Sequence, residues 1–336
     1  MTRRTHFRRL TLAALSLALA TVSGQALSQK AVEFRYGHMN PPNSAAGMQA
    51  QWLADAIAAN TSGQVKVTVY PSSQLGKLQE LAEAVSTGTI ALSHNTAGGI
   101  GSLHEPFGAL DTPYLYRDVE HLLKVTDVNS PVMKRLNEGL VKAAGVRVLY
   151  AYYFGTRQLT ANKLVRQPSD LSGQKIRAIP FPIYMSAVQG LGAVPVPVDW
   201  SEVPTALATG QVAGQENPVN VVLSSKLYER QSHMMLTGHI MNAQIVVINE
   251  KAWQALSAAQ REQITRAAND VRRKASDMVK NQEADELAKL KELKMNVIGP
   301  AEGLQVDAFR ASVNKLVQEK FGAKFGELYR EIAAIQ

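Results

Sequence analysis

The stretch "VKVTVYPSSQLGKLQELAEAVSTGTIALS", residues 65–93, decides the fold class. Apolar and polar side chains alternate over residues 65–70, as in a half-buried strand, and Pro71 ends this pattern. A short helix is predicted over 78–86 and a second strand over 90–93. A strand, a helix and a strand in succession are typical of an α/β domain with a largely parallel sheet.

Segments of the same character lie on both sides of this stretch. Strands are predicted over 34–38, 176–179, 194–198 and 245–248, and helices over 45–60, 183–191 and 201–209. Because Pro195 and Pro197 cannot donate backbone hydrogen bonds, the strand that holds them is expected to be bent or at a sheet edge. Ser257 and Gln260 form a capping-box pattern that begins a helix running to about residue 293, long enough to cross two domains.

The N-terminal residues have the pattern of a cleaved export signal. Arginines at positions 3, 4, 8 and 9 precede an apolar run over 10–22, and small residues follow it, with cleavage fitting after Ala26 or Ser28. The run is shorter than the roughly 20 apolar residues of a membrane-spanning helix. We therefore predict a signal peptide over 1–28 and a secreted mature chain.

The composition of the mature chain excludes several classes of function. The signal arginines account for half of the formal net charge of +8, and the remaining charge of about +4 does not indicate a nucleic-acid-binding protein. The absence of cysteine excludes thiol catalysis, disulfides and cysteine–metal sites. No dinucleotide-binding, P-loop, nucleophile-elbow or zinc-helix motif occurs, and no group of residues predicts a metal or a cofactor.

Arg177 lies in the middle of a predicted strand within "LSGQKIRAIP" (171–180), where it needs either solvent or a negative partner. Arg157, Trp200 and Asn217 lie near predicted strand ends, and ligands of open α/β sheets bind beyond the carboxyl ends of the strands. Each residue alone also fits a structural role, as a surface or ion-paired arginine, a core tryptophan or a turn asparagine. Together they favour a site for an anion with an apolar body.

Several longer segments, taken in order, carry a resemblance to a known family. They are "YPSSQLGKLQEL" (70–81), "FGTRQLTANK" (154–163), "LSGQKIRAIP" (171–180), "VDWSEVPTALATGQVAGQENP" (198–218) and "INEKAWQAL" (248–256). Over essentially the whole mature chain, the sequence resembles the periplasmic solute-binding proteins of TRAP transporters, the DctP-type receptor family.

The resemblance implies a role for individual residues. It implies that Arg177 pairs bidentately with a ligand carboxylate, that Arg157 and Asn217 support this contact, and that Trp200 lies against the ligand body. Further pocket-lining positions are implied on looser local matches, at Asn40, Asn95, Thr96, Phe181 and Gln244. Sialate-type receptors carry an acidic residue where this chain has Thr96, so sialic acid is not expected as the ligand.

The resemblance also implies the architecture and the biological role. The expected fold is a two-domain α/β fold of the periplasmic-binding-protein type, with a ligand cleft between the domains and a long helix spanning both. Domain I is expected over 30–153 plus 243–282, and domain II over 154–242 plus 283–336. A monomer of this kind binds an organic acid in the Gram-negative periplasm and delivers it to the small and large TRAP membrane subunits, where an ion gradient drives uptake without a cofactor on the receptor.

Two other functions fit the same pocket. A sensory ligand-binding subunit would deliver its signal to a receptor, and an extracytoplasmic enzyme acting on organic acids would need an acid–base pair beside the carboxylate site. We expect a non-catalytic receptor for a monocarboxylate, which could be a hydroxy, keto, aromatic or sugar acid. No third basic pocket residue is evident for a second carboxylate.

Overall fold

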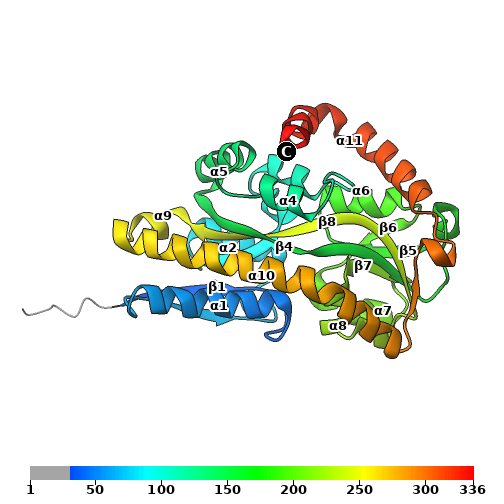
Figure 1. Cartoon of the computed structure of the whole chain (residues 1–336), viewed down its shortest axis with the longest axis horizontal. Coiled ribbons are helices and arrows are strands. Elements are labelled where there is room, and N and C mark those ends of the chain that lie inside the picture. The colour runs from blue at the N-terminus through cyan, green and yellow to red at the C-terminus, as the bar shows by residue number, and fades with distance from the viewer. Residues whose placement is uncertain (1–30) are drawn as a thin grey trace, which may run out of the picture. The chain divides into compact units, whose positions relative to one another are not determined.

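Two long antiparallel strands, β4 (Val146–Ala161) and β8 (His233–Asn249), form the centre of a mixed sheet that has nine strands in the described part of the chain. The computed structural model describes residues 31–336, so the predicted signal peptide over 1–28 lies outside the described residues. Residues 32–336 form one compact unit. Figure 1 shows β4 and β8 running together through the middle of this unit.

The remaining strands extend the sheet on both sides of this central pair. Next to β8 lie three strands that are parallel to one another, in the order β3 (Leu92–Thr96), β1 (Val32–Gly37) and β2 (Val65–Tyr70). Next to β4 lie β7 (Gly214–Pro218), β5 (Lys175–Ala178) and β6 (Val194–Pro197), which are also parallel to one another. The short β9 (Asn296–Ile298) pairs with the beginning of β8.

The stretch 65–93 folds largely as predicted. It contains β2, α2 (Leu78–Thr87) and the beginning of β3, and both strands pair in parallel with β1. The strand β3 begins two residues later than predicted, because the amide of Ile90 still donates to the carbonyl of Ala84 in the turn that closes α2. The proline-containing β6 lies at the edge of the sheet, as expected.

Helices cover both faces of the sheet. Besides α2 they are α1 (Ala45–Asn60), α3 (Ala97–Ile100), α4 (Val119–Val125), α5 (Pro131–Ala144), α6 (Pro182–Gly190), α7 (Val203–Ala208), α8 (Val219–Ser224), α9 (Glu250–Gln254), α10 (Ala258–Glu292) and α11 (Val306–Ala334). Short 3₁₀ helices include η3 (Trp200–Glu202), which directly precedes α7.

The helix α10 begins at the predicted capping box. The Ser257 hydroxyl accepts from the amide of Gln260 (3.1 Å), and the Gln260 side chain accepts from the amide of Ser257 (2.9 Å). An apolar stripe that includes Ile264, Val271 and Val279 is buried, while the opposite face is charged and exposed. Figure 1 shows α10 lying alongside α1 and reaching α8, which matches the predicted long helix.

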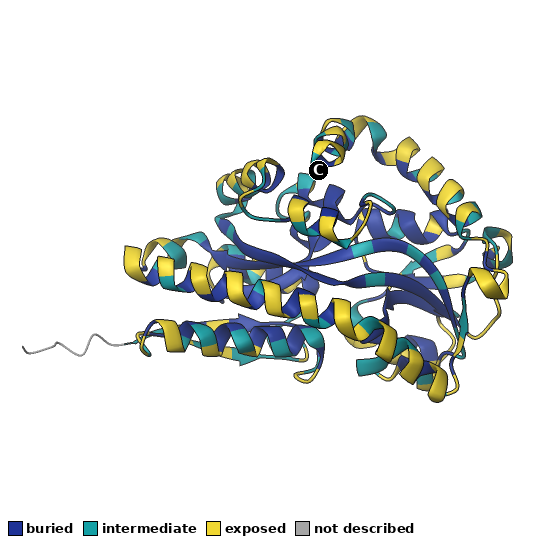
Figure 2. Ribbon diagram, in the orientation of Figure 1, coloured by how far each residue is buried: buried dark blue, intermediate teal, exposed yellow. Residues whose placement is uncertain are grey.

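The apolar core divides between the two faces of the sheet. One cluster joins α1 and α10 to the face that carries Tyr36 and Tyr150, and a larger one joins α2, α5, α6 and α11 to the other face. A third cluster lies under α7 and α8. Figure 2 shows the strands almost wholly buried and the helices exposed on their outer sides.

Among the described residues, no helix combines the length and the apolarity that crossing a membrane would require.

Candidate functional site

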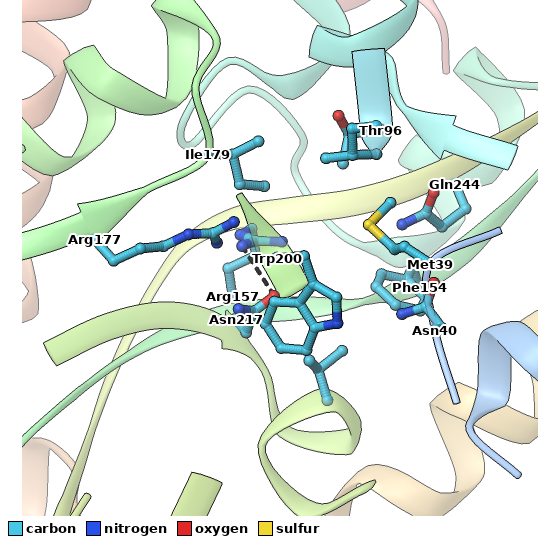
Figure 3. A pocket seen from close by; sticks show the side chains of 12 residues that line it. Met39, Asn40, Thr96, Phe154, Arg157, Arg177, Ile179, Trp200, Asn217 and Gln244 are labelled. Atoms are coloured by element: carbon cyan, nitrogen blue, oxygen red, sulfur yellow. Dashed lines mark hydrogen bonds between the residues drawn. The ribbon is translucent and has the colours of Figure 1, made fainter. Parts of the chain in front are cut away.

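A small cavity lies where the ends of several strands meet. Thr96 is the last residue of β3, Asn217 lies near the end of β7, Arg177 lies in β5, and Asn40 follows β1. This is the edge at which open α/β sheets bind ligands. Figure 3 shows the two arginines reaching the cavity from one side and Asn40 and Gln244 lying on the other.

Seven of the nine predicted pocket residues line this cavity. They are Asn40, Thr96, Arg157, Arg177, Trp200, Asn217 and Gln244. Five apolar residues of the wall were not predicted from the sequence. They are Met39, Leu78, Phe154, Ile179 and Val221.

The other two predicted residues, Asn95 and Phe181, do not line this cavity. Side chains alternate along β3, so Asn95 faces α2, where its amide donates to the carbonyl of Leu78 (2.7 Å). Phe181 is the N-cap residue of α6 and lines a separate surface hollow together with Phe321 and Phe325.

Arg177 is buried and has no carboxylate partner among the described residues. Its Nε donates to the carbonyl of Val198 (2.8 Å), and the ring of Trp200 lies 5.8 Å from its guanidinium carbon. Its Nη1 is buried without any hydrogen-bond partner in this part of the chain. Burial lowers the pKa of Arg177 to about 10, so the guanidinium is still charged at neutral pH.

Arg157 is equally buried but has its own counter-ion. Its Nε and Nη2 donate to the two carboxylate oxygens of Glu216, and Nη2 also reaches the Glu216 carbonyl (2.7 Å) and Asn217 Oδ1 (3.0 Å). The antiparallel pairing of β4 with β7 brings these residues together, because it sets Gln158 opposite Asn217. Nη1 donates to Asn242 (3.2 Å), which leaves one of its hydrogens for a ligand.

The carboxyl group of Glu216 is ionised in the folded chain. Burial raises the pKa of Glu216, but Arg157 and the hydrogen bond from His239 (3.1 Å) outweigh this effect and hold the pKa at about 2. Glu216 was not predicted as a site residue although it adjoins Asn217, because its partner Arg157 lies on another strand, 59 residues away in the sequence.

Asp111 is a second buried carboxyl group near Arg157. It accepts hydrogen bonds from the amide of Gly98 (2.7 Å), from the hydroxyl of Tyr184 (2.7 Å) and from the amide of Asn242 (2.9 Å). Burial raises the pKa of Asp111 to about 6. Its hydrogen bonds do not involve Arg177, so it does not replace the missing counter-ion of that residue.

The polar groups at the far side of the cavity differ in how they are held. Thr96 caps α3 by accepting from the amide of Gly99 (3.0 Å), and Asn40 Oδ1 is bonded to His94 Nε2 (3.1 Å). Gln244 makes no side-chain hydrogen bond among the described residues, and its Oε1 is buried. The cavity thus offers a cationic end, a polar end and aromatic walls. Within residues 31–336, no group of three or more histidine, aspartate or glutamate side chains is arranged to hold a metal.

Comparisons with known proteins match most of the chain. Residues 36–324 match the family model for bacterial extracellular solute-binding proteins of family 7, DctP. The sialic acid-binding periplasmic protein SiaP of Vibrio cholerae is 29% identical over 313 residues, which cover 93% of this chain and 95% of that protein.

Solved structures show the same fold. A TRAP periplasmic solute-binding protein from Polaromonas sp. JS666, bound to D-erythronate, is 31% identical with a TM-score of 0.83, covering 90% of this chain and 98% of that one. Another from Bordetella bronchispeptica, with ligand density assigned to pantoate, is 29% identical with a TM-score of 0.84, covering 91% and 99%. These matches confirm the predicted class, a two-domain α/β fold of the periplasmic-binding-protein type.

Proposed function

We propose that this chain, which belongs to family 7 of the bacterial extracellular solute-binding proteins (DctP), captures a small organic acid by its carboxylate and delivers it to a TRAP membrane permease. The observation that carries this proposal is the buried guanidinium of Arg177, whose Nη1 has no partner among the described residues. A charge buried without a partner costs several kcal/mol, and a bound carboxylate offsets that cost.

The groups around Arg177 suit a carboxylate. A guanidinium is planar and always charged, and its N–H groups match the two oxygens of a carboxylate. Asn217 retains one amide hydrogen, since its Nδ2 donates to Gln215 and its Oδ1 accepts from Arg157. Together with the remaining hydrogen of Arg157, these donors surround one anionic group.

The rest of the cavity favours a short acid with hydroxyl or keto groups. Trp200 and Phe154 provide flat apolar walls, while Asn40 and Gln244 provide hydrogen-bonding groups at the far side. D-erythronate and pantoate, named for two of the similar structures, are both small hydroxy acids. We favour a hydroxy or sugar acid with a single carboxylate.

The cellular setting follows from the family and from the predicted signal peptide. The proposed location is the periplasm, and the proposed partners are the small and large integral-membrane subunits of a transporter driven by an ion gradient. The family consists of receptors, which supports a non-catalytic role without a cofactor. Turnover of a bound acid would contradict that role.

A thermal-shift screen tests the proposal. The mature chain is heated with D-erythronate, pantoate, L-galactonate or succinate, and erythritol serves as a matched control that keeps the chain length of erythronate but lacks the carboxylate. At a concentration about 1,000 times its Kd, an acid stabilises the native state by about 4 kcal/mol and raises the melting temperature by several degrees. A shift with erythritol equal to that with erythronate, or no shift with any acid, would contradict it.

A further inference from the structure

A chain of buried polar side chains lies directly behind the cavity wall at Asn40. The hydroxyl of Tyr150 lies 2.5 Å from Gln49 Oε1, and Gln49 Nε2 lies 2.9 Å from the hydroxyl of Tyr36 and 3.1 Å from His94 Nδ1. His94 Nε2 in turn lies 3.1 Å from Asn40 Oδ1. Asn40 is the one member of this hydrogen-bonded series that lines the cavity, and the other members are buried behind it.

The atoms of Gln49 at each contact set the direction of the first hydrogen bonds. The Tyr150 hydroxyl donates to Gln49 Oε1 over 2.5 Å, a separation in the range of O–H···O bonds. The 2.9 Å and 3.1 Å contacts of Gln49 Nε2 are typical of an N–H donor. The carboxamide oxygen of Gln49 therefore faces Tyr150, and its amide nitrogen faces His94.

The amide nitrogen of Gln49 can only donate, so His94 must accept at Nδ1. The Tyr36 hydroxyl lies 2.9 Å from His94 Nδ1 and can donate to it as well. Burial, and then the neighbouring His38, hold the pKa of His94 well below its ordinary value, so the ring is neutral and carries one proton. That proton lies on Nε2, and Nε2 donates to Asn40 Oδ1.

The Asn40 side chain consequently has one orientation. Its oxygen is taken by His94, and its Nδ2, which has no partner among the described residues, is left for the cavity. Its backbone is fixed as well, because the amide of Ser72 donates to the carbonyl of Asn40 (3.0 Å). Gln244, by contrast, has no described side-chain partner and can turn either its oxygen or its nitrogen toward a ligand.

We infer that His94, held by Gln49, is a positioning residue that fixes Asn40 as a hydrogen-bond donor to the ligand. This end of the cavity then selects acids that carry an acceptor oxygen, such as a hydroxyl or keto group, away from the carboxylate. The inference deepens the proposed function and rests on it, since the acceptor is required of the same acid that Arg177 binds.

The first test reads the ring of His94 directly and needs no ligand. Long-range ¹H–¹⁵N spectra of the mature chain distinguish the two neutral tautomers of a histidine. His121 is an internal reference, because its Nδ1 accepts from the amide of Arg117 (3.2 Å) and its Nε2 donates to the carbonyl of Ile332 (3.0 Å). We expect His94 to show the Nε2–H pattern of His121; the Nδ1–H pattern would overturn the inference.

The second test measures whether His94 acts through Asn40. The variants His94→Phe, Asn40→Asp and the double variant are titrated with D-erythronate, pantoate and L-galactonate. For the acid that binds tightest, each single variant is expected to bind about tenfold more weakly or worse, because an unmade hydrogen bond leaves buried groups unpaired. The double variant should match Asn40→Asp within about twofold, since residues that act through one contact are not additive.

A matched pair of acids reports on selectivity. D-erythronate and 2-hydroxybutyrate share the chain length and the carboxylate, but 2-hydroxybutyrate lacks the outer hydroxyls. Native protein should prefer D-erythronate, and Asn40→Asp should reduce that preference about tenfold. The inference would be overturned if His94→Phe weakened binding equally in the native protein and in Asn40→Asp. It would also be overturned if Asn40→Asp kept the native preference for D-erythronate over 2-hydroxybutyrate. Either result would leave carboxylate capture intact.

The two proposals fail in different ways. If no acid binds the native chain, the proposed function fails, and the tautomer of His94 still decides the orientation of Asn40. If His94→Phe does not fold, the tautomer of His94 and the titrations of Asn40→Asp still test the inference.

Discussion

Two buried arginines near one cavity have different surroundings, and the difference assigns their roles. Arg157 is bound by Glu216 through both carboxylate oxygens, so its charge is balanced within the protein. Among residues 31–336, the guanidinium of Arg177 has only the Val198 carbonyl and the face of Trp200 as partners. Arg157 therefore supports the site as a member of an ion pair within the protein, and Arg177 supplies the positive charge that a ligand carboxylate balances.

Replacing Glu216 by glutamine should destabilise the chain in a pH-dependent way. The folded pKa of about 2 lies below the ordinary value of 4.5, so the unfolded chain binds more protons between these values. The contribution of Glu216 is thus fully present above pH 4.5 and is lost as the pH falls toward 2. At pH 7 we expect Glu216→Gln to lose about 3 kcal/mol, because Arg157 stays buried without its partner.

Urea unfolding of both proteins at pH 7 and at about pH 3.5 measures this effect. The difference in the free energy of unfolding between the native chain and Glu216→Gln should be smaller at the lower pH. An equal difference at both values would show that the charge of Glu216 is not what stabilises the fold.

For individual residues, the sequence predicted that Arg177 needs a partner, but it did not predict how the other side chains of the site are arranged. Arg177 in a strand with no acidic neighbour is readable from the local sequence. The pairing of Arg157 with Glu216 depends on the register of β4 against β7, which sequence patterns do not determine. The neighbours His94 and Asn95 point to opposite faces of β3, so a match to the segment alone could not tell which of them approaches the site.

Among the elements, β4 changes its pairing as it passes the site. Its register against β8 shifts between Tyr153 and Gly155, and Gly155 has a φ of +117°, a conformation that side-chain-bearing residues rarely adopt. A Cβ atom at Gly155 would lie 2.7 Å from Cβ of Pro218. Glycine is therefore required where β4 bends past the end of β7.

Gly155→Ala should destabilise the chain more than Gly173→Ala. Gly173 also has a positive φ (+72°), but a Cβ there would meet nothing within 4 Å. Its replacement should cost about 1–2 kcal/mol from the backbone conformation alone. Gly155→Ala adds a clash with backbone-linked atoms and should cost about 3 kcal/mol or more. Thermal unfolding of both variants measures this, and equal losses would mean that Pro218 moves away freely.

The sequence predicted elements with clear boundaries best. The helix α1 spans the predicted residues 45–60, because Ser44 caps it and Thr61 ends it. The strand β8 is 17 residues long, whereas only 245–248 was predicted, since its first half alternates less clearly. For α11 no prediction was made, although Phe309, Val313 and Val317 repeat at helical spacing on its buried side.

For the whole molecule, an ion-pair cluster links segments that the sequence assigned to different domains. Lys77, at the beginning of α2, lies 3.0 Å from Asp199 and 2.7 Å from Glu202 in and beside η3. We propose that domain I (30–153 plus 243–282) and domain II (154–242 plus 283–336) close over the ligand and that this cluster favours the closed form. A ligand and such a contact then stabilise the same state.

Lys77→Met should weaken binding of the acid without loss of folding. Exposed ion pairs contribute little and are screened by salt, so the Kd should rise about two- to fivefold, and the difference should shrink in high salt. Lys66→Met is a matched control, because Lys66 is exposed on β2 and forms no ion pair among the described residues. Calorimetric titrations at two salt concentrations measure the effect, and an equal change in both variants would exclude a closing role for Lys77.

The central claim is that the ligand carboxylate completes the buried charge of Arg177, and titration calorimetry of Arg177→Ala tests it most directly. The tightest-binding acid of the thermal-shift screen is titrated into the native chain and into this variant, with Arg177→Lys as a variant that keeps the charge but loses the paired N–H geometry. We predict that Arg177→Ala stays folded and loses at least about 3 kcal/mol of binding free energy, or more than 100-fold in Kd, with a smaller loss for Arg177→Lys. A folded Arg177→Ala protein whose Kd lies within a few-fold of the native value would contradict the account.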